Sequence, residues 1–409
     1  MFIETLNNGI KVIGEQIDYV SSATIGCWVK SGSIYERENE GGISHFIEHM
    51  MFKGTKKRTA TDIAYEMDAI GGQINAFTAK ECTCYYVKTI NDYIDEATDI
   101  LCDIVCNSVF DTSEMEKEKG VVIEEIGMVE DAPEDLVHDL LAQSYYKDYP
   151  LAKPILGTKE SVTAISRDMI QDYLNRHYVS EGIVVSIVGK FDKDHVLELL
   201  NKSLSCIEGK KAESLKTAFE PQKNSIFRKK DTEQTHICLA LPGFRMEDDK
   251  TYPLIALSNL FGGGMSSRLF QNIREKKGLV YSVYSYVSSY SHVGMFGIYA
   301  GTNDTQAKQV IELIFKEIDD IKKNSIKEDE FARAKQQMKA SYIMGLESTS
   351  NRMTALGKAL LLQEKIRSID ETIAKIDAVS IQNIVDILPE IFITDKMCSA
   401  GIGKTEFNI

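Results

Sequence analysis

The residues best suited to chemistry lie in one short segment, residues 41–50. His45, Glu48 and His49 follow the spacing H-x-x-E-H in this segment. On an α-helix the two histidines are one turn apart, and all three side chains fall within about 100° of arc. Two imidazoles at this spacing can bind one zinc ion. A carboxylate beside them can take a proton from a water molecule held by the metal.

This motif is rare enough to carry information. The chain has seven histidines, and H-x-x-E-H should arise by chance in on the order of one chain in a hundred of this composition. Two histidines on a helix could also be ordinary surface or core residues, although that alternative suits a lone histidine better. The motif reverses the order of H-E-x-x-H and is one of the signatures of zinc proteases.

A third ligand is needed, because a catalytic zinc ion normally takes three protein ligands and keeps one position for water. The best source is an acidic segment that contains Glu114, Glu116, Glu118, Glu124 and Glu125. Runs of charge usually form a solvated helix face, but the apolar residues 121–123 predict that this helix is partly buried. Glu118 and Glu125 would share a face, and Glu124 would point about 100° away. The spacing alone leaves the choice of face open.

The eight cysteines raise the question of a second metal site. Cys82 and Cys84 form a C-x-C, and Cys102 and Cys106 are four residues apart, so four thiols could bind zinc. The surrounding pattern favours core positions in a strand and in a helix, where small buried thiols pack well. Eight cysteines in so long a chain are not a disulfide scaffold, and a reducing, cytoplasmic setting is expected.

The composition excludes several classes of protein. The 409 residues carry a net charge of −14, which argues against nucleic acid as the main partner. No apolar run approaches 18 residues, so we expect no membrane span. Residues 1–15 show neither the basic and apolar regions of a signal peptide nor the character of a transit peptide. The expected protein has two or three domains, or two large ones.

Two α+β units of similar size are expected along the chain. The first has strands near 11–13, 23–29, 74–89 and 183–188, with helices near 42–52, 61–70, 93–108, 113–128 and 134–146. The second has strands near 236–241 and 279–299, with helices near 252–261, 305–322 and 328–363. Residues 205–231 are rich in Lys, Glu and Ser and have little periodicity. We therefore expect domains at 1–205 and 231–409, joined by a linker at 206–230.

At this point the chain resembles peptidase family M16, the inverzincins. It is most similar to the short bacterial branch related to pitrilysin and to the β subunit of the mitochondrial processing peptidase. The motifs that carry the resemblance are GISHFIEHMMFKGT at 42–55, GGQINAFT at 71–78, the acidic helix at 118–125, PILGT at 154–158, GGGMSSR at 262–268 and REKKGLVY at 274–281. They extend over nearly the whole chain.

The resemblance implies roles for residues of the first half. The zinc glutamate of the family lies 76 positions after the second histidine, which is Glu125 here. Glu118 matches a second glutamate, which is expected to orient a ligand or to buffer charge. Glu48 would be the catalytic base. Residues 71–78 would be an edge strand that pairs with the substrate backbone. Asn75, Ala76 and Phe77 of this strand would lie beside the bound substrate. Without the resemblance, an ordinary hairpin would be the better interpretation of this strand.

The resemblance also implies roles for the second half, which would bind substrate and close a chamber without a zinc site of its own. Arg274 would hold substrate carbonyl groups, and the Tyr281 hydroxyl would stabilise the oxyanion. The implied protein is a zinc endopeptidase that binds one Zn²⁺ per chain and cleaves unfolded peptides. Its two homologous antiparallel-rich domains would form a clamshell, and the chain would pair as a homodimer. The alternatives are a heterodimer with a metal-free partner and a non-catalytic peptide-binding protein.

Overall fold

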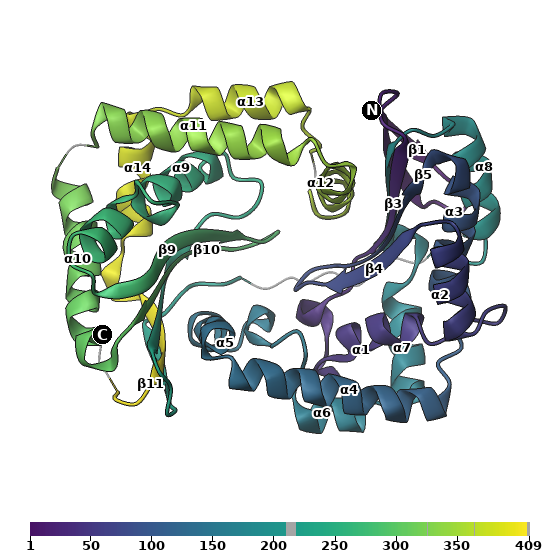
Figure 1. Ribbon diagram of the computed structural model, residues 1–409, viewed down its shortest axis with the longest axis horizontal. Helices are drawn as coiled ribbons and strands as arrows, with labels where there is room; N and C mark the ends of the chain where they lie inside the picture. Colours follow the sequence, from purple (N-terminus) through teal and green to yellow (C-terminus); the bar gives the residue numbers. More distant parts are fainter. Residues whose placement is uncertain (210–217, 325, 364, 407–409) are drawn as a thin grey trace. The chain divides into compact units, whose positions relative to one another are not determined.

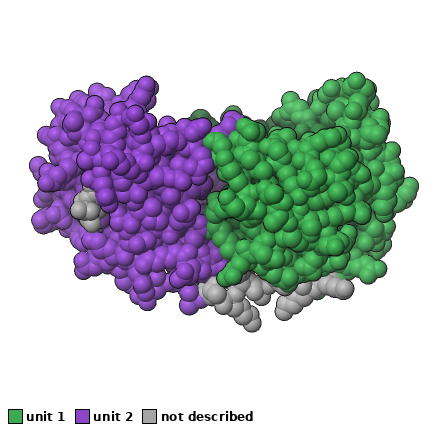
Figure 2. Space-filling view, turned by 90° about the horizontal axis from the view of Figure 1, so that it is seen from below, with its two compact units in different colours: residues 1–127, 153–216, 344–366 green, residues 128–152, 217–343, 367–409 purple. Residues whose placement is uncertain are grey.

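The chain divides into two compact units, which Figure 2 distinguishes by colour. The computed structural model describes residues 1–209, 218–324, 326–363 and 365–406. Unit 1 contains residues 1–127, 153–216 and 344–366, and unit 2 contains residues 128–152, 217–343 and 367–409. Each unit therefore includes a segment from the other half of the sequence, unlike the continuous domains 1–205 and 231–409 that the sequence suggested. The roles assigned to those domains and the clamshell stay predictions.

Unit 1 is built on a six-stranded sheet in the order β1-β2-β6-β3-β5-β4. Only β2 and β6 run parallel; the other neighbours are antiparallel. Its strands are β1 (Phe2–Thr5), β2 (Lys11–Gln16), β3 (Ser22–Val29), β4 (Gln73–Thr78), β5 (Thr83–Ile90) and β6 (Ile183–Gly189). Its helices are α1 (Ile43–Met51), α2 (Ala60–Ala69), α3 (Ile94–Asn107), α4 (Thr112–Asp131), α6 (Lys159–Ala164), α7 (Arg167–His177), α8 (Lys193–Ser203) and α12 (Thr349–Leu362); α4 runs past residue 127 into unit 2.

The two faces of this sheet are covered differently, because alternate residues of a strand point to opposite sides. On β3, Ile25 and Val29 belong to the large core beneath the helices that include α1, α3 and α8. Trp28 points to the opposite face, where it is fully buried beside Met353 of α12. A Cβ on Gly357 of α12 would lie 2.0 Å from the indole nitrogen of Trp28. The helix therefore approaches the sheet closely at this glycine.

Unit 2 repeats this architecture on a five-stranded sheet in the order β7-β11-β8-β10-β9. Its strands are β7 (Asn224–Lys229), β8 (Thr235–Gly243), β9 (Val280–Ser289), β10 (Gly294–Thr302) and β11 (Cys398–Gly403). One face packs against α5 (Pro133–Tyr146). The other packs against α9 (Thr251–Gly262), α10 (Ala307–Lys323) and α14 (Ile381–Ile391), with α11 (Glu328–Gly345) and α13 (Ile369–Ala378) beyond them (Figure 1).

The two units have matching topology. Strands β2, β6, β3, β5 and β4 of unit 1 correspond in order and direction to β7, β11, β8, β10 and β9 of unit 2. The order of the helices along the chain matches too, and it pairs α1 with α9, α4 with α11 and α5 with α12. The expected α+β fold of two similar antiparallel-rich units is confirmed.

Two expected elements were wrong. The helix expected at 328–363 is two helices, α11 and α12, because the chain leaves the helix after Gly345 and Ser348 caps a new one by accepting from Asn351 N. Residues 224–229 of the expected linker form β7, which pairs in parallel with β11. The linker's residues 210–217 lie outside the described residues. No helix in the described part of the chain has both the length and the apolar character to cross a membrane.

Candidate metal centre

Helix α1 begins at a tightly held turn. Gly42, the residue before the helix, has a φ of 84°, and a Cβ there would lie 2.5 Å from the carbonyl oxygen of Leu156. Only glycine suits this left-handed backbone and close approach. The buried Glu36 carboxylate accepts hydrogen bonds from Gly42 N at 2.9 Å and from Ser44 N at 3.0 Å. A carboxylate at this position complements the positive end of the helix dipole. These contacts fix the helix that carries His45 and His49.

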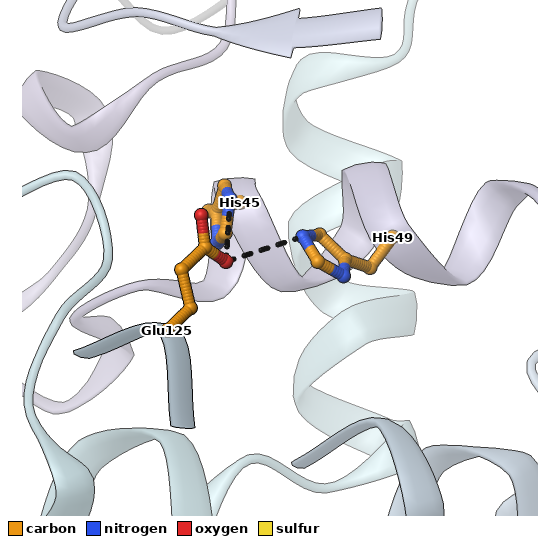
Figure 3. Close-up of side chains that lie close together, drawn as sticks. All are labelled: His45, His49 and Glu125. Carbon is orange, nitrogen blue, oxygen red and sulfur yellow. Dashed lines mark ion pairs between the residues drawn. The ribbon is translucent and has the colours of Figure 1, made fainter. Parts of the chain in front are cut away.

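Three side chains from α1 and α4 converge on one point (Figure 3). The Nε2 atom of His45 lies 3.7 Å from Oε2 of Glu125, and Nε2 of His49 lies 3.6 Å from the same oxygen. Two atoms that each lie about 2.0 Å from a tetrahedral ion are roughly 3.3 Å apart. The observed separations are close to that value. Among the described residues, this is the only group of three or more His, Cys, Asp or Glu side chains close enough to hold a metal ion.

The second nitrogen of His49 has a partner of its own. Its Nδ1 lies 2.8 Å from Oε1 of Glu118, and Oε2 of Glu118 lies 2.6 Å from Nζ of Lys53. Burial alone would raise the pKa of Glu118, but the hydrogen bonds from Lys53 and His49 lower it overall. The ionised carboxylate accepts the Nδ1 proton of His49. The lone pair of Nε2 is therefore directed toward Glu125, as metal binding requires.

His45 is also prepared to act as a neutral ligand. Burial, together with the neighbouring His49, lowers its pKa to about 4. The imidazole therefore keeps a free lone pair at neutral pH. Its Nδ1 atom is buried without a hydrogen-bond partner. Two neutral imidazoles and one carboxylate are the donor set of many catalytic zinc sites, so the residues fit a zinc ion.

Glu48 is not one of the three clustered side chains. It accepts a hydrogen bond of 2.5 Å from the hydroxyl of Thr78, the last residue of β4. Burial raises its pKa above the ordinary value, and the bond from Thr78 opposes part of that change. A carboxylate with a raised pKa beside a metal site is suited to receive and return a proton.

Strand β4 lies at the edge of the sheet and pairs only with β5 among the described strands. Asn75 is exposed, and its side-chain oxygen accepts from Ala76 N at 2.8 Å. Phe77 is half-buried and packs edge-on against Trp28, with ring centroids 5.6 Å apart. An exposed edge can accept an extended peptide through main-chain hydrogen bonds. The edge leads to Thr78, which contacts Glu48.

The structure places Arg274 and Tyr281 in unit 2, apart in sequence from His45, His49 and Glu125. Arg274 lies in a π-helical segment, Phe270–Glu275, and its guanidinium is 4.7 Å from the Phe270 ring and 5.9 Å from the Tyr281 ring. Tyr281, at the start of β9, is 75% exposed. The two side chains are neighbours in unit 2, and their action on substrate stays a prediction.

Three residues of this site were not identified from the sequence. Lys53 and Thr78 belong to motifs that the sequence singled out, but no pattern indicated that they contact Glu118 and Glu48. Glu36 had no signal, because a glutamate six residues before a glycine is common in any chain. Their partners are distant in sequence or depend on a loop conformation, which periodicity does not report.

The sequence matches two family models. The first is described as "Insulinase (Peptidase family M16)" and covers residues 11–159. The second is described as "Peptidase M16 inactive domain" and covers residues 164–338.

Relatives extend over nearly the full chain. A Bacillus subtilis protein named as the uncharacterized zinc protease YmxG is 42% identical over 393 residues, which are 96% of this chain and 95% of that protein. The uncharacterized zinc protease SCO5738 of Streptomyces coelicolor is 37% identical and covers 92% of this chain and 84% of its own length.

Solved structures share the fold. The peptidase M16 inactive domain from Pseudomonas fluorescens has a TM-score of 0.92 at 18% identity and covers 100% of this chain and 99% of its own. A protease from Helicobacter pylori has a TM-score of 0.89 at 21% identity and covers 98% of this chain and 99% of its own.

Proposed function

The chain belongs to peptidase family M16, and we propose that it is a zinc-dependent endopeptidase that hydrolyses peptides or unfolded polypeptide segments. The observation that carries the proposal is the approach of His45 Nε2 and His49 Nε2 to the same oxygen of Glu125, at 3.7 and 3.6 Å. Glu48 stands on the same helix without being one of the three. The names of the relatives as zinc proteases support this assignment.

The proposed ligands of one zinc ion per chain are His45, His49 and Glu125. When bound, zinc supplies a Lewis acid that lowers the pKa of water and polarises a carbonyl group. Glu118 holds His49 in the tautomer that directs Nε2 toward the metal position. Lys53 keeps the Glu118 carboxylate in place through its ion pair of 2.6 Å.

Glu48 is the proposed proton carrier. Its carboxylate takes a proton from the attacking water and returns it to the nitrogen of the leaving amine. Thr78 donates to one carboxylate oxygen and so limits the rotation of the side chain. The raised pKa of Glu48 brings it closer to the pH at which a single group can both accept and release a proton.

Strand β4 is the proposed binding site for the substrate backbone. A peptide added to its free edge would run beside Asn75 and Ala76 toward Thr78, the last residue of the strand, whose hydroxyl contacts Glu48 of α1. Main-chain pairing accepts many sequences, which suits a peptidase acting on unfolded segments. Phe77 supports the strand by packing against Trp28.

Arg274 and Tyr281 of unit 2 are proposed to act on the substrate carbonyl groups. Their side chains are neighbours, and the exposed Tyr281 hydroxyl can donate to an oxyanion. Arg274→Ala and Tyr281→Phe should slow peptide cleavage while leaving the zinc content at one per chain. Loss of zinc from either variant would contradict this placement.

The decisive experiment combines metal analysis with digestion of a peptide library, with and without a chelator. Glu48→Gln should keep zinc and lose cleavage, and Glu125→Gln should lose zinc. Glu124→Gln is the matched control, because Glu124 is an exposed neighbour on α4 outside the cluster. It should keep both zinc and activity. Cleavage by Glu48→Gln at the wild-type rate would overturn the mechanism.

We further propose that the chain pairs as a homodimer and encloses its substrate in a chamber. The alternatives are a catalytic subunit paired with a metal-free partner and a peptide-binding protein without activity. The complete set of ligands and base in unit 1 favours the enzyme. Size exclusion and mass measurement on the purified protein distinguish a homodimer from a heterodimer, and the digestion experiment distinguishes the enzyme from a binding protein.

A further inference from the structure

One cysteine of this chain differs from the others in its exposure. All eight lie in the described residues; Cys206 is exposed, Cys106 is half-buried, and the remaining six are buried. Cys106 and Cys206 are one hundred residues apart in sequence, but the packing of α3 against α8 brings their chain segments together. An accessible thiol beside a less accessible one is the arrangement of a reactive and a resolving cysteine.

The contact between the two segments is well defined. The Cys106 sulfur, in the last turn of α3, lies 3.6 Å from the carbonyl oxygen of Ser203, the last residue of α8. The chain then turns, with Ile207 N donating to Leu204 O at 3.1 Å. Asn8 holds this turn by donating to the carbonyl oxygens of Leu204 and Ile207, at 2.8 and 3.0 Å. Cys206 lies in this held turn, three residues after the Ser203 carbonyl that the Cys106 sulfur contacts.

Cys106 and Cys206 affect each other's ionisation. A hydrogen bond between them lowers the pKa of Cys206, and the nearby Lys56 adds to the effect. The same hydrogen bond, followed by burial, raises the pKa of Cys106. Cys206 is thus the thiol that ionises first and reacts with an external disulfide. Lys56 is fixed at this place because its backbone N donates to the carbonyl oxygen of Asn107 at 3.0 Å.

We propose that Cys106 and Cys206 form a redox-active dithiol that small-molecule disulfides convert to an intramolecular disulfide. The Cys206 thiolate attacks one sulfur of the small disulfide, a mixed disulfide forms, and one small thiolate leaves. The Cys106 thiol then loses its proton and attacks the Cys206 sulfur, which releases the second small thiolate. Two protein thiols are oxidised and one small disulfide is reduced to two thiols, so atoms and electrons balance.

This bond would lie beside the helix of the proposed metal centre. Asn107 and Ser108 follow Cys106 directly, and the Ser108 hydroxyl donates to the carbonyl oxygen of Met51, the last residue of α1, at 3.1 Å. Oxidation or reduction of the Cys106–Cys206 pair would therefore take place close to the contact between α3 and the end of α1. The proposal does not depend on peptidase activity, because it concerns only the two thiols.

The test is to treat the reduced, folded protein with oxidised glutathione near neutral pH and to measure its mass. The wild-type chain should lose two hydrogens and gain no glutathionyl group. Cleavage before Asp103 separates Cys102 from Cys106, so the digest identifies which α3 cysteine is bound to Cys206. A bond between Cys102 and Cys206, or a stable mixed disulfide on wild-type Cys206, would overturn the proposal.

Two variants make the result specific. Cys106→Ala should stop at one glutathionyl group on Cys206, because the resolving thiol is gone. Cys102→Ala is the matched control on the same helix and should form the disulfide as the wild type does. The pH profile of iodoacetamide alkylation at Cys206 should also move to higher pH in Cys106→Ala, since the stabilising hydrogen bond is lost. An unchanged profile would contradict the assigned contact.

Discussion

Glu118 links the His49 ring to Lys53: one carboxylate oxygen lies 2.8 Å from His49 Nδ1 and the other lies 2.6 Å from Lys53 Nζ. The carboxylate is almost completely buried, with 6% of its side chain exposed. Its contact with the candidate metal centre is the one to His49 Nδ1. A buried carboxylate with this pair of contacts can fix both the tautomer and the orientation of the imidazole.

Glu118→Ala should weaken zinc binding by about 10- to 100-fold, the usual effect of losing a carboxylate that orients a histidine ligand. The remaining ligands should still bind zinc at high metal concentration. Competition with a chromophoric chelator measures the change. Glu116→Ala is the control, because Glu116 is on the same helix and forms its ion pair with Lys119, at 2.8 Å, away from His49. Equal affinities for the Glu118→Ala variant and the wild type would refute the role of Glu118.

Thr78→Val should lower the turnover of peptide while zinc content stays at one per chain. The bond from Thr78 opposes the rise that burial causes in the pKa of Glu48, so its loss should raise that pKa further. A base works only when it is deprotonated, and the acidic limb of the kcat/KM profile should therefore move to higher pH. Thr78→Ser should restore the wild-type profile, because it keeps the hydroxyl. A lower rate with an unmoved profile would mean that Thr78 supports the strand and does not act on Glu48.

Stability at acid pH should depend on His177, a fully buried residue of α7. Burial, assisted by Arg176 and Arg37, lowers its pKa from 6.5 to about 4. The unfolded chain therefore binds more protons between these values, and the free energy of unfolding falls as the pH drops through this range, by about 3 kcal/mol at most. Chemical denaturation of the metal-free protein at several pH values measures this loss. In His177→Gln the dependence should be shallower.

His195→Gln provides the contrast. His195 is exposed, and its hydrogen bond with Asp95 raises its pKa. Protonation of His195 therefore favours the folded state, and its contribution is lost as the pH rises. The two variants should change the pH dependence in opposite directions. The same change in both would show that the burial of His177 is not the cause.

Gly357→Ala should destabilise unit 1, because the new Cβ would lie 2.0 Å from the indole nitrogen of Trp28. Overpacking of this kind typically costs about 1–3 kcal/mol, more than the gain of about 1 kcal/mol from placing alanine in a helix. Gly120→Ala is the control, since nothing lies within 4 Å of that added Cβ in α4. It should gain stability. Thermal unfolding of both variants measures the difference.

The part of the site that depends on local geometry could be predicted from the sequence. The spacing of His45, Glu48 and His49 places them on one helix face whatever the rest of the chain does. Glu118 and Glu125 are two turns apart, so their spacing could not tell which one approaches the histidines. In the structure Glu125 faces both Nε2 atoms and Glu118 contacts the opposite side of His49. That difference depends on how α4 packs against α1.

Strand β11 was not indicated by the sequence, and its composition explains why. Strand β11 is buried along its whole length but reads Cys-Ser-Ala-Gly-Ile-Gly, so it has neither an apolar run nor an alternating pattern. Its small residues allow the close approach of α5 on one face. The break between α11 and α12 was also missed, because both segments are helical and only three residues separate them. A short interruption of this kind changes the direction of the chain without changing the apparent period.

Helix α5 belongs to unit 2 although it lies in the first half of the sequence, and α12 belongs to unit 1 although it lies in the second half. This exchange has a consequence for synthesis of the chain. The ribosome synthesises the strands of the first sheet long before α12. The face of this sheet that carries Trp28 can therefore be buried only after residues 349–362 have been made. Helix α5, in turn, is made before any strand of the sheet that it covers. A nascent chain of about two hundred residues would therefore contain a first sheet whose Trp28 face is not yet covered by α12. It would also contain α5 without the sheet on which this helix packs. Both packing contacts must form late in translation.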